Sequence, residues 1–77
     1  MKQRKPSKAI DYYKEALQHE PRSAEIYRNL GLALLAADKL GEAKDYLTEA
    51  VRLNPDDKSA RDNLEMVLSK IKPVLAK

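Results

Sequence analysis

The chain repeats itself at an offset of 34 residues, the separation between Ala9 and Ala43, and this feature constrains its fold more than any other. At that offset residues 9–16 align with residues 43–50, and the proline that follows each segment also aligns. Six of the fourteen positions from Ala9 onward are identical. A period in the range of roughly 20–50 residues is typical of solenoids, in which each repeat packs only against its neighbours.

Apolar residues recur every three or four positions in four segments, which predicts amphipathic helices. Ser23 is placed to cap one helix, Asp56 and Asp57 are placed to cap another, and Pro21 is placed to stop one. No segment shows the alternation of a strand. We therefore predict an all-α fold: a basic, poorly ordered lead at 1–7, a helical domain at 8–72 with helices over about residues 8–20, 24–37, 40–53 and 57–71, and a tail at 73–77.

The composition excludes several classes of function. The chain has no Cys and one His, which removes disulfides, thiolate zinc sites and most triad chemistry. Its longest apolar run, at 32–37, has six residues, far short of the roughly 20 that cross a bilayer. No apolar stretch follows the charged start as it would in a secretory signal. We expect no membrane span, no metal and no cofactor, and a cytoplasmic location is favoured over secretion.

His19 is the most reactive side chain at neutral pH, but only Glu15 and Glu20 lie near it in sequence. Pairs of carboxylates one helical turn apart also occur, and they recur at the 34-residue offset, which favours a structural origin. Acid–base catalysis requires a pocket that shifts pKa values, and no Gly-rich phosphate loop or metal spacing is present. We predict no catalytic residue and no enzymatic activity.

The net charge of +3 comes from the N-terminus. Residues 1–8 hold four bases and no acid, whereas residues 9–55 hold six bases and eight acids. A nucleic-acid-binding protein normally has a basic stripe and often aromatic residues for stacking. Because the excess is a short lead rather than a basic face, binding to nucleic acid is disfavoured.

Residues 24–57 resemble a tetratricopeptide repeat in both period and motif. Small side chains at Gly31 and Ala43 allow the two helices of a hairpin to approach closely, and Asp38 stands where a turn glycine is usual. The resemblance implies four antiparallel helices in a right-handed stack of helical hairpins. The residues that match the family's structural positions are Tyr27, Leu30, Gly31, Leu34, Ala43, Leu47, Ala50 and Pro55.

The chain is offset from the repeat boundaries by half a unit. It holds the second helix of one repeat, one whole repeat, and the first helix of another. In the last helix Glu65 replaces the counterpart of Gly31, and Arg61 replaces the counterpart of Tyr27, as suits a terminal helix with a polar outer face. The first helix keeps the apolar residues of an interior repeat, and these are candidates for self-association: Ala9, Tyr12, Tyr13, Ala16 and Leu17.

In the family that the chain resembles, the first helix of each repeat lines a concave groove that receives peptides or helices. The resemblance implies the same function here, as a protein-interaction scaffold. An equally open alternative is that Leu32, Leu35 and Ala36 are simply buried by neighbouring helices. The groove candidates are Glu25, Arg28, Asn29, Leu32, Leu35, Ala36, Asp62, Met66 and Lys70.

Three other functions stay open. The chain can be a self-association module that forms homo-oligomers, by docking or by exchange of helices. It can be an excised or engineered repeat unit with no ligand of its own. The least favoured is a nucleic-acid adaptor that uses the basic N-terminus.

Overall fold

The computed structural model of the chain describes residues 6–71. The predicted tail and most of the predicted basic lead lie outside the described residues. Within that range the chain forms helices only, which confirms the all-α fold class. The helices are α1 (Pro6–His19), α2 (Ala24–Ala36), α3 (Leu40–Leu53) and α4 (Lys58–Ile71), so that α1 begins two residues earlier, and α4 one residue later, than the sequence pattern indicated.

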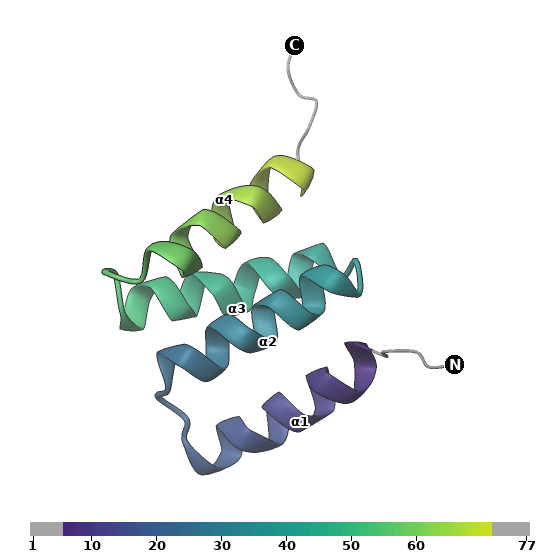
Figure 1. The fold of residues 1–77 in the computed structure, drawn as a ribbon, viewed down its shortest axis with the longest axis vertical. Coiled ribbons are helices and arrows are strands. Elements are labelled where there is room, and N and C mark those ends of the chain that lie inside the picture. Colours follow the sequence, from purple (N-terminus) through teal and green to yellow (C-terminus); the bar gives the residue numbers. More distant parts are fainter. Residues whose placement is uncertain (1–5, 72–77) are drawn as a thin grey trace.

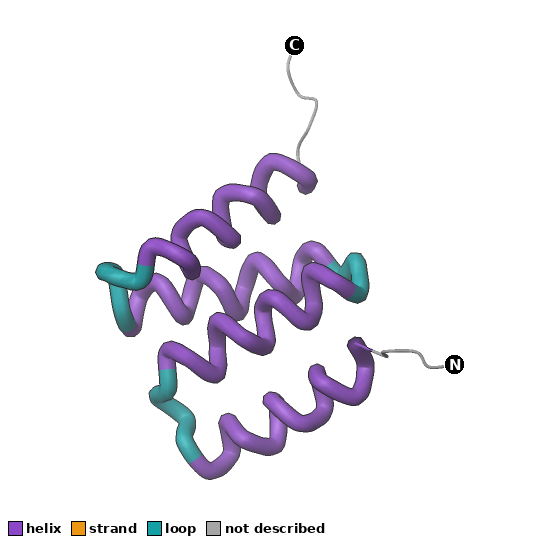
Figure 2. The backbone as a smooth tube through the Cα atoms, in the orientation of Figure 1, coloured by secondary structure: helices purple, strands orange, loops and turns teal. Residues whose placement is uncertain are grey.

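The four helices form a stack in chain order, with each helix antiparallel to the next (Figure 1). Consecutive helices contact one another, and α2 also contacts α4 across the turn of the stack. Short turns join them (Figure 2), so each helix has little freedom except to fold back on the previous one. Since α2 and α4 are both the first helix of a repeat, this contact brings successive repeats side by side.

Local side-chain chemistry sets the helix boundaries. Ser23 Oγ accepts a hydrogen bond from the backbone N–H of Ile26 at 3.2 Å, at the start of α2, and Asp57 Oδ1 accepts from that of Ala60 at 3.2 Å, at the start of α4. Each bond satisfies a backbone donor that has no partner within the helix. After α2 the chain reverses at Asp38, whose φ of 65° lies in the left-handed region that Asp tolerates. The cap at Ser23 and the role of Asp38 are confirmed, and of the two residues predicted to cap α4 it is Asp57, not Asp56, that accepts the bond.

The hydrophobic core lies along the α2–α3 hairpin and extends to both outer helices. The closest approach is at Gly31, where an added Cβ would lie 2.5 Å from Leu47 Cγ. Because real Cβ atoms do not come that near, a side chain at position 31 would require Leu47 or the two helices to shift. The buried apolar residues are Ile10, Leu30, Leu34, Ala43, Leu47, Ala50, Ala60 and Val67.

Candidate interaction surfaces

The first surface is the side-by-side pair of first helices, α2 and α4, where the groove was expected. Leu32 is half-buried, and Met66 on α4 is 46% exposed. Leu35 is half-buried because it packs against the core, so it is only partly available to a ligand. Among the other groove candidates, Asn29 is half-buried, and the exposed ones are Glu25, Ala36, Asp62 and Lys70.

Arg28 links the two helices of this surface. Its guanidinium Nη1 lies 2.8 Å from Asp57 Oδ2, and Asp57 is also the residue that caps α4. The hydrogen bond from Arg28, aided by the backbone N–H of Ala60, lowers the pKa of the Asp57 carboxyl below its ordinary value. Arg28, which the sequence suggested as a ligand-binding residue, therefore holds the N-terminus of α4 against α2.

The other charged residues on this surface differ in whether they form ion pairs. Asp62 accepts from Lys58 at 3.0 Å across one helical turn, with both side chains mostly exposed. Exposed pairs of this kind contribute little to stability and exchange readily with other partners. Glu25 and Lys70 make no ion pair with any other residue between 6 and 71. The surface thus has an acidic group in the first turn of α2, another in the second turn of α4, and a basic residue near the end of α4.

The second surface is the outer side of α1. Tyr12 is 67% exposed, and its ring meets that of Tyr13 edge-on at a centroid distance of 5.5 Å. Tyr13 and Leu17 pack against the core, so of the five self-association candidates these two already face inward, while Ala9 and Ala16 are half-buried.

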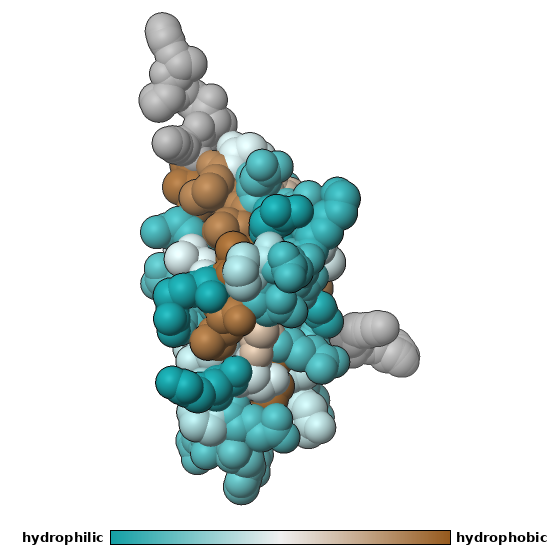
Figure 3. Space-filling view, turned by 90° about the vertical axis from the view of Figure 1, so that its left-hand side faces the viewer, coloured by the Kyte–Doolittle hydropathy of each residue, from teal (hydrophilic) through white to brown (hydrophobic). Residues whose placement is uncertain are grey.

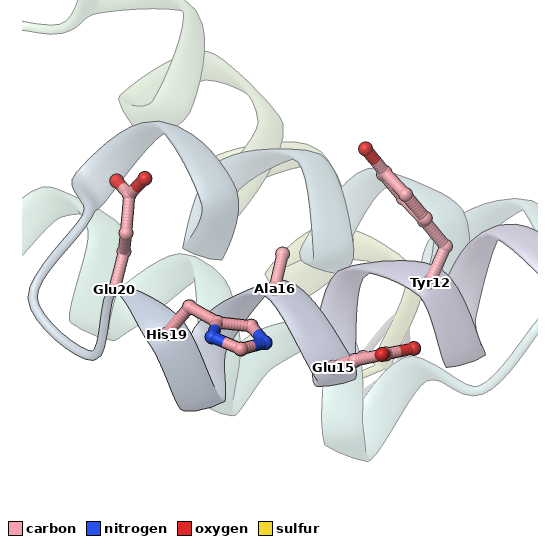
Figure 4. Close-up of a pocket in the computed structure, with 5 residues that line it drawn as sticks. All are labelled: Tyr12, Glu15, Ala16, His19 and Glu20. Atoms are coloured by element: carbon pink, nitrogen blue, oxygen red, sulfur yellow. The ribbon is translucent and has the colours of Figure 1, made fainter.

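A shallow pocket of about 270 Å³ lies on this outer side. Its lining side chains come from the last three turns of α1 and the residue after it, and Ala16 lies between Tyr12 and Glu20 along the helix (Figure 4). His19 is exposed at its edge. The residues that line it are Tyr12, Glu15, Ala16, His19 and Glu20.

The third surface is the outer side of α4. Arg61 and Glu65 are exposed, as predicted for a terminal helix. Leu68 and Ile71 are also exposed, at 42% and 39%, and Figure 3 shows apolar atoms gathered near the C-terminal end of the molecule between hydrophilic surfaces. The helix is therefore only partly polar on its outer side. The sequence pattern places Leu68 on the apolar face of this helix, but it does not indicate that 42% of the residue stays exposed.

Neither a metal-binding cluster nor a membrane-spanning helix is found among residues 6–71. Between residues 6 and 71 no group of three or more His, Asp or Glu side chains is arranged to hold a metal ion. In the same range none of the helices has both the length and the apolar character that crossing a membrane requires. The three surfaces have in common exposed apolar area and exposed charged side chains.

Comparison with known proteins gives two results. Residues 1–61 match a family model described as "Tetratricopeptide repeat". A protein of Guillardia theta described as "Uncharacterized protein ycf37" is 30% identical over 63 residues, which cover 82% of this chain and 35% of that protein. The chain thus spans about a third of the length of the relative it matches.

Proposed function

The chain belongs to the tetratricopeptide repeat family, and on that premise we propose that it binds a peptide or helix of a partner protein on the α2–α4 surface. Repeats of this family generally mediate protein–protein interaction. Family members are typically scaffolds rather than enzymes, and we propose that this chain too has no catalytic activity.

The observation that carries this proposal is the apolar pair Leu32 and Met66 on neighbouring first helices. Leu32 keeps part of its side chain accessible and Met66 about half, and methionine adapts its shape to different apolar partners. The acids Glu25 and Asp62 lie toward the N-terminal ends of these helices, and Lys70 lies toward the C-terminal end of α4. The partner is therefore an amphipathic segment whose apolar side chains meet Leu32 and Met66 and whose basic residue meets Glu25 or Asp62.

Selection from a library of displayed peptides against the immobilised chain tests this proposal. We expect the enriched peptides to combine apolar and basic residues, and to lose at least tenfold in affinity for the variants Leu32→Glu and Met66→Glu. The matched control is Lys14→Glu, which alters an exposed side chain on α1 and leaves the affinity unchanged. Circular dichroism checks that each variant keeps its helices. Peptides that bind the control and the Leu32→Glu variant equally would remove the proposal.

Self-association remains a second candidate function, because the exposed Tyr12 on α1 and the exposed Leu68 and Ile71 on α4 leave apolar area at both ends of the stack. Light scattering on a sizing column over a hundredfold range of concentration tests it. A mass that rises above 8.7 kDa and returns to that value in a Leu68→Lys variant would support it. A constant monomeric mass would exclude it.

No contact among residues 6–71 favours binding to nucleic acid. Most of the Lys and Arg residues of the basic N-terminus, which would make that contact, lie outside this range.

A further inference from the structure

Three exposed side chains form a row along α4 on the α2–α4 surface, and we call them the α4 row. They are Asp62, Met66 and Lys70, each four residues from the next. Residues at this spacing lie on the same side of a helix, about 6 Å apart along its axis. From the N-terminal to the C-terminal end of α4, the row therefore presents an acid, a methionine that is 46% exposed, and a base.

The corresponding row on α2 carries different side chains. Its members, at the 34-residue offset, are Arg28, Leu32 and Ala36. Arg28 is held by Asp57, with 2.8 Å between Nη1 and Oδ2, and the alanine is uncharged. Leu32 is half-buried and adds apolar area at the position that corresponds to the methionine. The order of charges on this surface is therefore set by α4, and Glu25 in the first turn of α2 adds a second acid at the N-terminal end.

Both charged ends of the α4 row are accessible to a partner. Asp62 pairs with Lys58 at 3.0 Å, but 59% of the Asp62 side chain and 76% of the Lys58 side chain are exposed, so this pair costs little to replace. Lys70 makes no ion pair with any other residue between 6 and 71. A base of the partner opposite Asp62 and an acid opposite Lys70 would each form an ion pair at small cost.

The distance between the two charges suits a helix that lies alongside α4. Asp62 and Lys70 are eight residues apart, which corresponds to about 12 Å along the helix axis. A partner helix has the same rise per residue, so side chains at its positions i, i+4 and i+8 match the three members of the α4 row. The complementary order is a base opposite Asp62, an apolar residue opposite Met66 and an acid opposite Lys70.

The helix dipole selects the direction of such a partner. A helix is stabilised by an acid near its N-terminus and a base near its C-terminus. A partner with that order pairs its charges with the α4 row only when it runs antiparallel to α4. The helices α2 and α4 point the same way (Figure 1), so an antiparallel partner also opposes both of their dipoles, which is the favourable arrangement.

We propose that the α2–α4 surface binds a partner helix that runs antiparallel to α4 and carries the pattern acid–x3–apolar–x3–base, read from its N-terminus. Its Asp or Glu meets Lys70, its apolar residue packs on Met66 and Leu32, and its Lys or Arg meets Asp62. The proposal rests on the function proposed above, which names the surface and an amphipathic partner. It adds the order of the partner's charges, their spacing and the direction of the bound helix.

Three synthetic peptides of the same composition test this pattern by fluorescence anisotropy. The first carries Glu, Leu and Lys four residues apart in an alanine-rich helix, and the second carries them in the order Lys, Leu and Glu. The third has the order of the first but a spacing of two residues, so its charges match the α4 row only in an extended chain. We expect the first peptide to bind at least threefold more tightly than either of the others.

Charge reversal in the protein locates the two ion pairs. Lys70→Glu and Asp62→Lys should each weaken binding of the first peptide about two- to fivefold, as expected for exposed ion pairs. Reversing the facing charge of the peptide should recover the loss. The matched controls are Lys14→Glu on α1 and Asp45→Lys on α3, which make the same changes of charge at exposed positions on other helices and should leave the affinity unchanged.

Paramagnetic labels on the first peptide determine its direction. A nitroxide at the peptide's N-terminus should broaden the amide signals near Lys70, and one at its C-terminus should broaden those near Asp62. The opposite result would mean that the helix runs parallel to α4, and it would overturn the proposal.

Three further results would overturn it. One is tighter binding of the peptide with the extended spacing. Another is an affinity that falls with Leu32→Glu and Met66→Glu but with neither charge reversal, and the proposed function would then stand without the charge pattern. The third is a dimer, seen by light scattering, that Met66→Glu dissociates, because α4 of a second copy carries the same pattern and would be the occupant. Failure of all three peptides and of the library selection would remove the proposed function, and this proposal with it.

Discussion

The helices α2 and α4 carry the same repeat pattern in two different surroundings. Leu34 in α2 is fully buried, whereas Leu68, at the same position in α4, is 42% exposed. The difference comes from the neighbours, because α2 packs against α1, α3 and α4, while α4 contacts only α3 and α2 within residues 6–71. The repeat pattern thus determines which side of a helix is apolar, and the number of packed neighbours determines how much that side contributes to stability.

Truncation of the equivalent leucines should show the largest effect. Leu34→Ala leaves a cavity in the core and should lower the free energy of unfolding by about 2–5 kcal/mol, which is a large share of what a small domain possesses. Leu68→Ala removes a half-exposed side chain and should cost less than about 1 kcal/mol. Urea denaturation followed by circular dichroism measures both. Equal losses would contradict the comparison and would mean that another chain covers Leu68 in solution.

The second largest difference in stability is expected between substitutions at the equivalent positions 31 and 65. Gly31→Ala places a methyl group against Leu47 Cγ, and overpacking of this kind costs about 1–3 kcal/mol, more than the roughly 1 kcal/mol that Ala gains over Gly in a helix. Glu65→Ala changes an exposed side chain and should stay within about 0.5 kcal/mol. Thermal denaturation of the two variants at one protein concentration decides the point. A stabilised Gly31→Ala variant would show that Leu47 moves aside freely.

The caps of the two helices should show the smallest effects, and they should differ in pH dependence. Ser23→Ala removes the cap of α2 at a cost of about 0.5–2 kcal/mol, and this cost should be the same at pH 7 and pH 3 because serine does not titrate. Asp57→Asn keeps a capping oxygen but loses the charge that pairs with Arg28, so it too should be less stable than the native chain at pH 7.

The loss caused by Asp57→Asn should fade in acid. Because the folded-state pKa of Asp57 is lowered, its charge stabilises the fold above the ordinary pKa of about 3.8, and the stabilisation disappears as the pH falls through the lower folded-state value. The urea midpoints of the native chain and the variant should therefore converge once the pH is below the folded-state pKa of Asp57. A difference that persists unchanged at pH 2 would show that the charge on Asp57 is not what stabilises the start of α4.

Most of the fold could be predicted from the sequence because its determinants are local or periodic. The apolar spacing indicates the helices, Ser23 and Asp57 lie directly before the backbone donors that they cap, and the 34-residue offset relates one hairpin to the next. The close contact at Gly31 also follows, since a glycine inside a helix needs a packing reason. The observed α1 begins at Pro6, two residues before the approximate range of 8–20, and proline is well suited to the first turn of a helix.

The interaction surfaces could be predicted only in part. The ion pair between Arg28 and Asp57 joins residues 29 positions apart, and it depends on how α2 and α4 align in space, which no local pattern encodes. The self-association candidates Tyr12 and Tyr13 also differ in the structure, since Tyr12 faces solvent and Tyr13 packs against the core. The 34-residue offset predicts that α1 and α3 are equivalent. The pocket beside Ala16 could not be predicted, because it depends on how the side chains are arranged in the folded structure.

The contact between Arg28 and Asp57 has a consequence for how the chain opens. In a stack where each helix touches mainly the next one, opening can begin at either end and spread inward, and amides near the ends exchange with solvent before those in the middle. The Arg28–Asp57 pair spans the boundary between two repeats, so we expect the first turn of α4 to open together with the second turn of α2 rather than alone. The cooperative unit at this end of the molecule is therefore larger than one helix, and a partner bound on α2 can slow hydrogen exchange at the start of α4 without touching it.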